Sequence, residues 1–297
     1  MRIDSRTVIA GALLSGAILV YIVGLVGWRQ GALFLVGIGA GLILYHAAFG
    51  FTSAWRDMIS KGRGAGLRAQ MIMLAITAIV FLPLLADGQL WGMELRGSVR
   101  PLSVSVIAGA FLFGVGMQLG GGCASGTLFT AGGGNMRMVL TLVAFIVGSA
   151  LGAYHLPAWQ AAPGFGPVSL LGQFGLGLAL VISLVLFASV WLGSAFVERR
   201  RYGALEKNAT CFATDSWLRG PWPLVAGAVG LAGVNVATLT LAGRPWGVTS
   251  GFALWGSKVA AALGFNVAAW PYWQGPTASA ALEASVFSDI TSVMNFG

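Results

Sequence analysis

The chain has 297 residues, of which 57% are hydrophobic and 9% are Asp, Glu, Lys or Arg, and its mean hydropathy is +0.83. An ordinary soluble domain carries about 25% charged residues, so this composition excludes a soluble globular fold for most of the chain. The formal net charge is +8, and its distribution fits a membrane topology rather than a nucleic-acid surface, so we expect no nucleic-acid partner.

Apolar runs of membrane-spanning length follow one another along the chain. About 20 such residues form a helix that crosses a ~30 Å hydrocarbon core. We therefore predict an all-α, polytopic helical membrane protein in contact with membrane lipids. The runs that contain no Asp, Glu, Lys or Arg are Thr7–Gly27, Gly31–Phe49, Ala69–Ala86, Met138–Tyr154, Leu171–Gly193 and Pro223–Ala242.

The basic residues are distributed unevenly between the connections. With alternating spans and the N-terminus in the cytoplasm, twelve Lys and Arg lie inside and four outside, as the positive-inside rule requires. Lys258 is left unassigned. The inside group is Arg2, Arg6, Arg56, Lys61, Arg63, Arg68, Arg137, Arg199, Arg200, Arg201, Lys207 and Arg219; the outside group is Arg29, Arg96, Arg100 and Arg244.

One charged linker divides the apolar segments into two groups. We predict a first membrane repeat over residues 1–196, a basic cytoplasmic linker over residues 197–220 and a second membrane repeat over residues 221–297. Cys211, in this linker, is interpreted as a free thiol without a specific role, because two cysteines cannot form a disulfide framework or a multi-thiolate metal site. His46 and His155 lack metal-ligand spacing, so we expect no metal and no cofactor.

A short motif recurs on both sides of the linker. Gly50–Gly62 and Gly247–Lys258 each read G-x-T-S, then an aromatic-containing turn, then Lys eleven residues after the Gly, at an offset of 197 residues. Glycine-interrupted segments at corresponding positions of two halves indicate the substrate site of a transporter. The same offset would place a counterpart of Cys123 near position 320, so we expect the second repeat to be incomplete at the C-terminus.

The stretch "GVGMQLGGGCASGTLFTAGGGN", Gly114–Asn135, places a cysteine between two glycine triplets. We expect the first triplet to end a helix over Pro101–Leu119, and the second to end a short helix over Gly126–Ala131 that Ser125 caps. Unwound backbone within a bilayer is tolerated only where it is buried in protein or lines a cavity. The pattern therefore predicts a broken or re-entrant segment at mid-membrane.

The chemistry of this loop suits a small oxyanion that carries sulfur. A helix N-terminus offers unpaired N–H groups and a partial positive charge. The backbone around Gly121 and Gly122 and the hydroxyls of Ser125 and Thr127 would bind the oxygens, and the soft thiol of Cys123 would contact the sulfur. Two alternatives stay open: Cys123 is only a small buried hydrophobe at a tight helix crossing, or it reacts covalently, since helix N-termini lower thiol pKa values.

Polar residues of the repeated motif form a second candidate set. We expect Thr52–Ser53 and Thr249–Ser250 to line the approaches to the site. Arg56 either pairs with Asp57 at the inner interface or faces the pathway and attracts an anion. Lys258 lies in the otherwise uncharged Val248–Ala269, where an ionisable residue is expected to be functional, snorkelling to the interface being the alternative.

Three segments resemble the YeeE/YedE family of bacterial inner-membrane proteins: "FTSAWRDM" at Phe51–Met58, "GxGMxLGGGCxSG" at Gly114–Gly126 and "PWGVTSGFALWG" at Pro245–Gly256. The resemblance covers nearly the whole chain, and the family includes thiosulfate transporters. It implies an hourglass-shaped fold of two pseudo-symmetric halves whose loops meet at mid-membrane, with thiosulfate passing along cysteines by S–H···S and S–H···O hydrogen bonds. Cys123 matches the central cysteine, whereas Gly50 stands where family members often have another.

The resemblance also implies partners and a location. Some relatives are associated with selenium metabolism, and cytosolic TusA-like sulfurtransferases are partners that the basic linker could receive. We predict a bacterial inner-membrane transporter, not an enzyme, that takes up a small sulfur-containing oxyanion, thiosulfate above all. The alternatives are a membrane sulfur- or selenium-handling enzyme or redox partner that uses Cys123 covalently, and a structural subunit whose glycine loops only pack.

Overall fold

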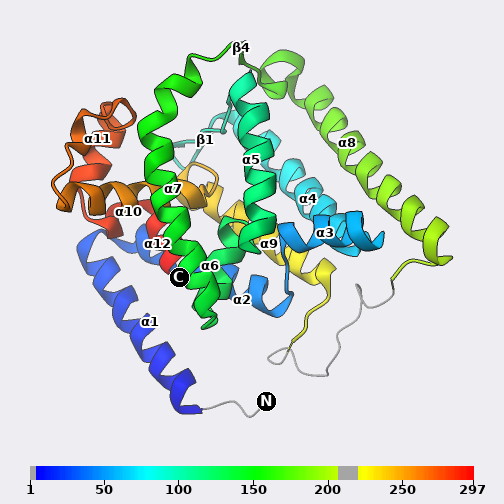
Figure 1. The fold of residues 1–297 in the computed structure, drawn as a ribbon, viewed down its shortest axis with the longest axis horizontal. Helices are drawn as coiled ribbons and strands as arrows, with labels where there is room; N and C mark the ends of the chain where they lie inside the picture. Colours follow the sequence, from blue (N-terminus) through cyan, green and yellow to red (C-terminus); the bar gives the residue numbers. More distant parts are fainter. Residues whose placement is uncertain (1–4, 207–219) are drawn as a thin grey trace.

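The computed structural model describes residues 5–206 and 220–297 as an almost entirely helical bundle (Figure 1). Cys211 and most of the predicted linker lie outside the described residues. The helices are α1 (Ser5–Leu25), α2 (Trp28–His46), α3 (Phe51–Lys61), α4 (Ala65–Asp87), α5 (Val104–Gly120), α6 (Ala124–Gly132), α7 (Met136–Gln160), α8 (Leu170–Tyr202), α9 (Leu224–Ala242), α10 (Val248–Ala262), α11 (Pro276–Glu283) and α12 (Ile290–Phe296).

Within residues 5–206 and 220–297, strands form two short pairs. β1 (Gln89–Leu90) pairs with β2 (Met93–Glu94), and β3 (Pro101–Ser103) pairs with β4 (Gly164–Pro167), both antiparallel. Three single 3₁₀ turns occupy Val267–Ala269, Pro271–Trp273 and Val286–Ser288. The strands cap the ends of long helices and leave the bundle itself all-α, as the composition predicts.

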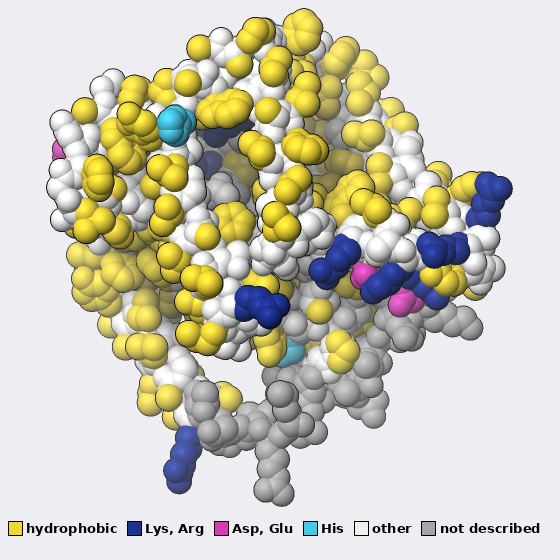
Figure 2. Space-filling model, viewed as in Figure 1, with side chains coloured by type: hydrophobic (Ala, Val, Ile, Leu, Met, Phe, Trp, Pro, Cys, Tyr) yellow, Lys and Arg dark blue, Asp and Glu magenta, His cyan; other side chains and the backbone are white. Residues whose placement is uncertain are grey.

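The predicted spans are confirmed as helices. Within the described residues, seven helical segments are long and apolar enough to cross a membrane, two of them formed by the consecutive pairs α2–α3 and α5–α6. Large apolar side chains cover much of the surface seen in Figure 2. Leu13 of α1 and Phe111 of α5, for example, are both about 70% exposed. This exposure is the arrangement expected of helices whose outward faces contact lipid.

The helix break at the glycine–cysteine loop is also confirmed. Helix α5 ends at Gly120, and Gly121 follows in the left-handed region with φ 79°, a conformation that favours glycine because it has no Cβ. Helix α6 then runs for nine residues and ends at Gly132. One detail was wrong: the N-cap of α6 is Cys123 rather than Ser125, so the short helix begins two residues earlier than expected.

The repeated motif has a counterpart in the positions of the helices. Helices α2 and α9 both have 19 residues, and α3 and α10 begin at Phe51 and Val248, 197 residues apart. Helices α3 and α10 each follow a short non-helical connection. Helix α2 packs against α9. The correspondence stops after α10, because at the same offset from α4 the chain forms 3₁₀ turns and α11. The division into two repeats therefore stays a prediction.

The buried core packs the helices together mainly through small and aliphatic side chains. Helix α4 packs against α8 and α9, and one buried cluster at their junction with α2 consists of Leu44, Ala47, Phe49, Ala69, Ala228 and Leu231. The C-terminal helix α12 packs against α2 and α10 and is buried from Thr291 to Asn295. Its backbone approaches Gly37 so closely that a side chain there would collide with Met294.

Candidate functional site

The break between α5 and α6 holds the five candidates of the glycine–cysteine loop in one short segment. They are Gly121, Gly122, Cys123, Ser125 and Thr127. Cys123 is about 9% exposed, and its Sγ lies 3.5 Å from the Ser125 Oγ. The first backbone bond of α6 runs from the Thr127 N–H to the Cys123 carbonyl. The N–H groups of residues 124–126 precede that bond, so they lack helical partners and point toward the N-terminal end of the helix.

Thr127 contributes a buried hydroxyl to this segment. Its side chain is fully buried, and its Oγ1 has no hydrogen-bond partner within the described residues. A Cβ on Gly122 would lie 3.0 Å from this oxygen, so the glycine leaves the space beside the hydroxyl open. An unsatisfied buried hydroxyl costs stability, and a polar ligand at the α6 N-terminus would supply the missing partner.

The α2–α3 turn presents a second unpartnered hydroxyl. Thr52 is buried, and its Oγ1 lacks a partner within the described residues. Two glutamines that the sequence analysis did not single out hold this turn in place. The Gln70 Nε2 donates to the Gly50 carbonyl at 3.3 Å, and the Gln118 Nε2 donates to the Thr52 carbonyl at 3.5 Å. The second of these bonds connects the α3 approach directly to α5, the helix that ends at the glycine–cysteine loop.

The serines of the repeated motif make the same local hydrogen bond. The Ser53 Oγ donates to the Gly50 carbonyl at 3.1 Å, and the Ser250 Oγ donates to the Gly247 carbonyl at 2.8 Å. The threonines beside them differ, because Thr249 is exposed while Thr52 is buried. The first motif thus borders the α5–α6 region, whereas Ser250 also contacts the Thr291 hydroxyl of α12.

Arg56 and Asp57 do not pair with each other. Asp57 forms an ion pair with Lys61 at 2.7 Å, one helical turn further along α3. The Arg56 side chain is exposed on the outside of α3, where it contacts none of the central candidates described above. Of the two interpretations of Arg56, pairing with Asp57 is therefore wrong, and attraction of an anion stays a prediction.

Lys258 occupies a structural position. Helix α10 has only 15 residues, so the predicted apolar segment Val248–Ala269 is not a continuous span. The Lys258 Nζ donates to the carbonyls of Leu282 and Ala284 at 2.5 and 2.7 Å. These carbonyls terminate α11, where a cation is favoured by the unsatisfied C=O groups and the helix dipole. The ammonium group is satisfied by these bonds, at the end of α11 and not at the α6 N-terminus.

A buried carboxylate that the sequence analysis missed organises the neighbouring end of the bundle. Glu198 of α8 is fully buried and accepts hydrogen bonds from the Arg68 Nη1 at 2.6 Å and the Arg63 Nη1 at 3.2 Å. It also accepts from the backbone N–H groups of Gly64 and Glu206 at 3.1 and 3.0 Å. The cluster fixes the α3–α4 turn to the end of α8. The sequence offered no local signal for its ion pairs, because Arg68 and Arg63 lie 130 and 135 residues from Glu198.

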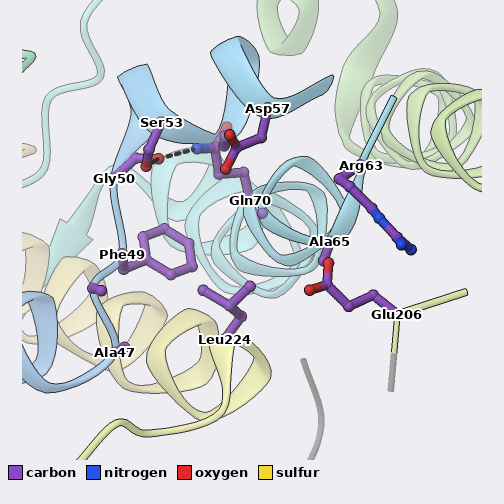
Figure 3. A pocket seen from close by; sticks show the side chains of 13 residues that line it. Ala47, Phe49, Gly50, Ser53, Asp57, Arg63, Ala65, Gln70, Glu206 and Leu224 are labelled. Atoms are coloured by element: carbon purple, nitrogen blue, oxygen red, sulfur yellow. Dashed lines mark hydrogen bonds between the residues drawn. The ribbon is translucent and has the colours of Figure 1, made fainter. Parts of the chain in front are cut away.

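Two cavities border the buried cluster that contains Leu44, Ala47 and Phe49. The first, of about 370 Å³, is bordered by the α2–α3 turn, α3 and the start of α4 and includes Gly50, Ser53 and Gln70 (Figure 3). The second, of about 670 Å³, is mainly apolar and includes Ser125 and Phe129. Phe129 also packs against the cluster that contains Phe49, which borders the first cavity. The apolar side chains of Phe129 and Phe49 thus lie between the second cavity, which includes Ser125, and the first cavity.

The chain matches a family model described as sulphur transport over residues 46–297. It is 30% identical over 195 residues to the probable transporter YedE of Salmonella typhimurium, covering 61% of this chain and 47% of that protein. It is 29% identical over 231 residues to the thiosulfate transporter TsuA of Spirochaeta thermophila, covering 72% of this chain and 64% of that protein. The chain therefore spans about half the length of the YedE protein and under two thirds of TsuA.

Proposed function

The chain belongs to the sulphur transport family, and on that premise we propose that it carries a small sulfur-containing oxyanion, with thiosulfate as the first candidate, across the bacterial inner membrane. The matched part includes the broken α5–α6 helix and both repeated motifs. Two of the relatives are named thiosulfate transporters. We propose import into the cytoplasm, with the N-terminus and the Arg-rich ends of α3 and α8 on the cytoplasmic side, because positive charge gathers there (Figure 2).

The observation that carries the proposal is the α6 N-terminus. A nine-residue helix capped by Cys123 begins inside an otherwise membrane-spanning segment, and the buried Thr127 hydroxyl beside it has no partner in the described part of the chain. Free N–H groups and a hydroxyl are donors that suit the oxygens of an oxyanion. The Cys123 thiol, 3.5 Å from Ser125, is the soft group that suits a sulfur atom. We propose that these groups bind the substrate directly.

The repeated motifs have unequal roles in this proposal. Thr52 and Ser53 would line an approach to the α6 N-terminus, because Gln118 joins the Thr52 carbonyl to α5, the helix that ends at the glycine–cysteine loop. Ser250 and Thr249 belong to the α10 side of the bundle, near α12. A TusA-like sulfurtransferase, or another cytosolic acceptor of sulfur, would meet the basic end of α8 at Arg199–Arg201. Contact with membrane lipids follows from the exposed apolar surface.

The experiment that tests the proposal is uptake of labelled thiosulfate into cells that lack other sulfate and thiosulfate importers. Wild-type protein should support uptake and thiosulfate-dependent growth, and Cys123→Ala should reduce both sharply, because removing a buried hydrogen-bonding partner costs ~1–3 kcal/mol. Cys211→Ala is the matched control and should behave as wild type. Equal losses from both variants would contradict the assignment of Cys123, and no uptake by well-expressed wild-type protein would contradict thiosulfate as the substrate.

A mass measurement on the same protein distinguishes non-covalent passage of the substrate from covalent modification of the Cys123 thiol. A transporter that only hydrogen-bonds its substrate leaves Cys123 unmodified after incubation with thiosulfate. A stable mass increase of about 32 Da on Cys123, one sulfur atom, would instead support the persulfide alternative.

A further inference from the structure

The cavity of about 370 Å³ beside the α2–α3 turn is lined by small and apolar residues together with a group of hydrogen-bond acceptors. Asp57 and Glu206 contribute carboxylates, and Ser53 contributes an oxygen whose hydrogen is already donated to Gly50. Figure 3 shows Ser53, Asp57 and Gln70 along one wall, with the carboxylate of Glu206 reaching in from another side. The remaining lining is apolar or backbone. The concentration of acceptors sets this cavity apart from the donor-rich N-terminus of α6.

Gln70 gives an independent indication of what the cavity accommodates. Its side chain is only 4% exposed, and its Nε2 is used by the Gly50 carbonyl. Its Oε1 is buried and has no hydrogen-bond partner within the described residues. A buried acceptor without a partner is costly. The missing partner must be a cation or a hydrogen-bond donor, and an anion cannot supply it.

The C-terminal end of α2 has the same preference, although the N-terminal turns of α3 and α4 also border the cavity. Helix α2 ends at His46, and the non-helical residues 47–50 border the cavity before α3 begins. The C-terminal end of a helix carries a partial negative charge and favours cations. Unwound backbone beside a helix end is where coupling ions bind in transporters with broken helices.

The cationic side chains near the cavity are already engaged. The Arg63 guanidinium pairs with Glu198 and lies over the Tyr202 ring at 3.6 Å, and in Figure 3 it points away from the other lining side chains. Lys61 pairs with Asp57, but its own side chain is 65% exposed, and exposed ion pairs of this type are weak. Neither Arg63 nor Lys61 therefore neutralises the carboxylates of both Asp57 and Glu206 from within the cavity.

We propose that this cavity binds a hydrated monovalent cation, Na⁺, which is carried together with the anionic substrate. Within the described residues, no group of three or more His, Cys, Asp and Glu side chains could hold a metal ion. That leaves the cavity short of the carboxylates that a divalent ion requires. Co-transport rests on the proposed function: a dianion such as thiosulfate that enters a cell with a negative interior moves against the membrane potential, and each accompanying Na⁺ offsets one of its two negative charges.

The first test measures thermal unfolding of the purified, detergent-solubilised protein at constant ionic strength in NaCl, KCl or choline chloride. Na⁺ should raise the melting temperature above the choline value, because a ligand that binds only the folded state stabilises it. Asp57→Asn and Glu206→Gln should each weaken the apparent Na⁺ affinity by about tenfold, the loss expected from removing one charged hydrogen-bonding group. Glu94→Gln, a carboxylate change on the β1–β2 hairpin, is the matched control and should leave the response unchanged.

Gln70→Met tests the unpartnered oxygen, since it keeps the side-chain volume and removes the amide. It should also weaken the Na⁺ response; if this variant does not fold, the two carboxylate variants decide. A melting temperature that is the same in NaCl and choline chloride would overturn the cation site. A Na⁺ response that survives in the Asp57→Asn, Glu206→Gln double variant would overturn its location.

The second test is thiosulfate uptake into proteoliposomes with and without an inward Na⁺ gradient. Uptake that requires Na⁺ in wild type and loses this requirement or fails in Asp57→Asn supports co-transport. Uptake that is independent of Na⁺ overturns co-transport and leaves the proposed function intact. No uptake under any condition, together with a Na⁺ response that Asp57→Asn removes, supports the cation site and overturns thiosulfate as the substrate.

Discussion

The Arg68 Nη1 lies 2.6 Å from the Glu198 Oε2, and both side chains are more than nine-tenths buried. The pair joins the first turn of α4 to the last turns of α8. Arg68, Arg63 and the backbone N–H groups of Gly64 and Glu206 all donate hydrogen bonds to the Glu198 carboxylate, which is thereby satisfied. A buried ion pair adds little net stability compared with apolar packing, but breaking one leaves an uncompensated charge.

Glu198→Ala is expected to destabilise the protein strongly. It leaves Arg68 buried and unpaired, which costs about 3–5 kcal/mol. Denaturant or thermal unfolding in detergent measures the loss. The matched control is Glu94→Ala, which breaks the exposed Glu94–Arg96 pair and should change the stability little. A Glu198 variant as stable as the Glu94 variant would contradict the buried network.

Thr127→Val is expected to separate stability from transport. The valine keeps the shape of the side chain and removes a hydroxyl that has no partner among the residues that the structure describes, so the free energy of unfolding should stay the same or rise. Uptake should fall about tenfold if the hydroxyl binds substrate, the effect of losing roughly one hydrogen bond to a charged group. Thr127→Ser keeps the hydroxyl and should retain uptake. A Val variant that transports normally would exclude the hydroxyl from the substrate site.

Gly122→Ala is expected to impair uptake by filling the space beside Thr127. The added Cβ would lie 3.0 Å from the Thr127 Oγ1 and 3.1 Å from its backbone nitrogen, closer than ordinary van der Waals contact. Gly114→Ala on α5 is the control, because nothing lies within 4 Å of a Cβ at that position. Uptake assays at matched expression compare the two, and equal activity would show that the space next to the α6 N-terminus is not used.

Lys258→Met is expected to affect stability and leave substrate affinity unchanged. The variant loses the two hydrogen bonds to the end of α11, at a cost of about 1–3 kcal/mol. The concentration of thiosulfate that gives half-maximal uptake should remain that of the wild type. A large rise in this concentration, without loss of stability, would return Lys258 to the substrate pathway.

The local sequence was sufficient to predict the helices and the central break. Hydrophobic runs of spanning length and glycine triplets act through nearest neighbours along the chain, so the α5–α6 interruption at residues 121–123 could be located within a few residues. The motif at Gly50 and Gly247 likewise predicted two interruptions 197 residues apart, and the structure begins α3 and α10 there, so that Thr52–Ser53 and Thr249–Ser250 lie in first helical turns and not in loops. The N-cap was placed at Ser125 instead of Cys123, because the capping preference of serine was weighed without the backbone conformation that the glycines impose.

Long-range contacts decided the rest. Lys258 was assigned to a span because its neighbours are apolar, yet the chain turns after α10 and brings the end of α11 to its ammonium group. Glu198, Gln70 and Gln118 gave no local signal, since the arginine partners of Glu198 and the carbonyl partners of the two glutamines are 20 to 135 residues away. The sequence by itself determined the membrane-spanning class and the place where a helix breaks, because hydrophobicity and backbone freedom are local properties. Only the tertiary structure determined which buried polar atoms are satisfied and which remain open to a ligand, because that depends on segments distant along the chain.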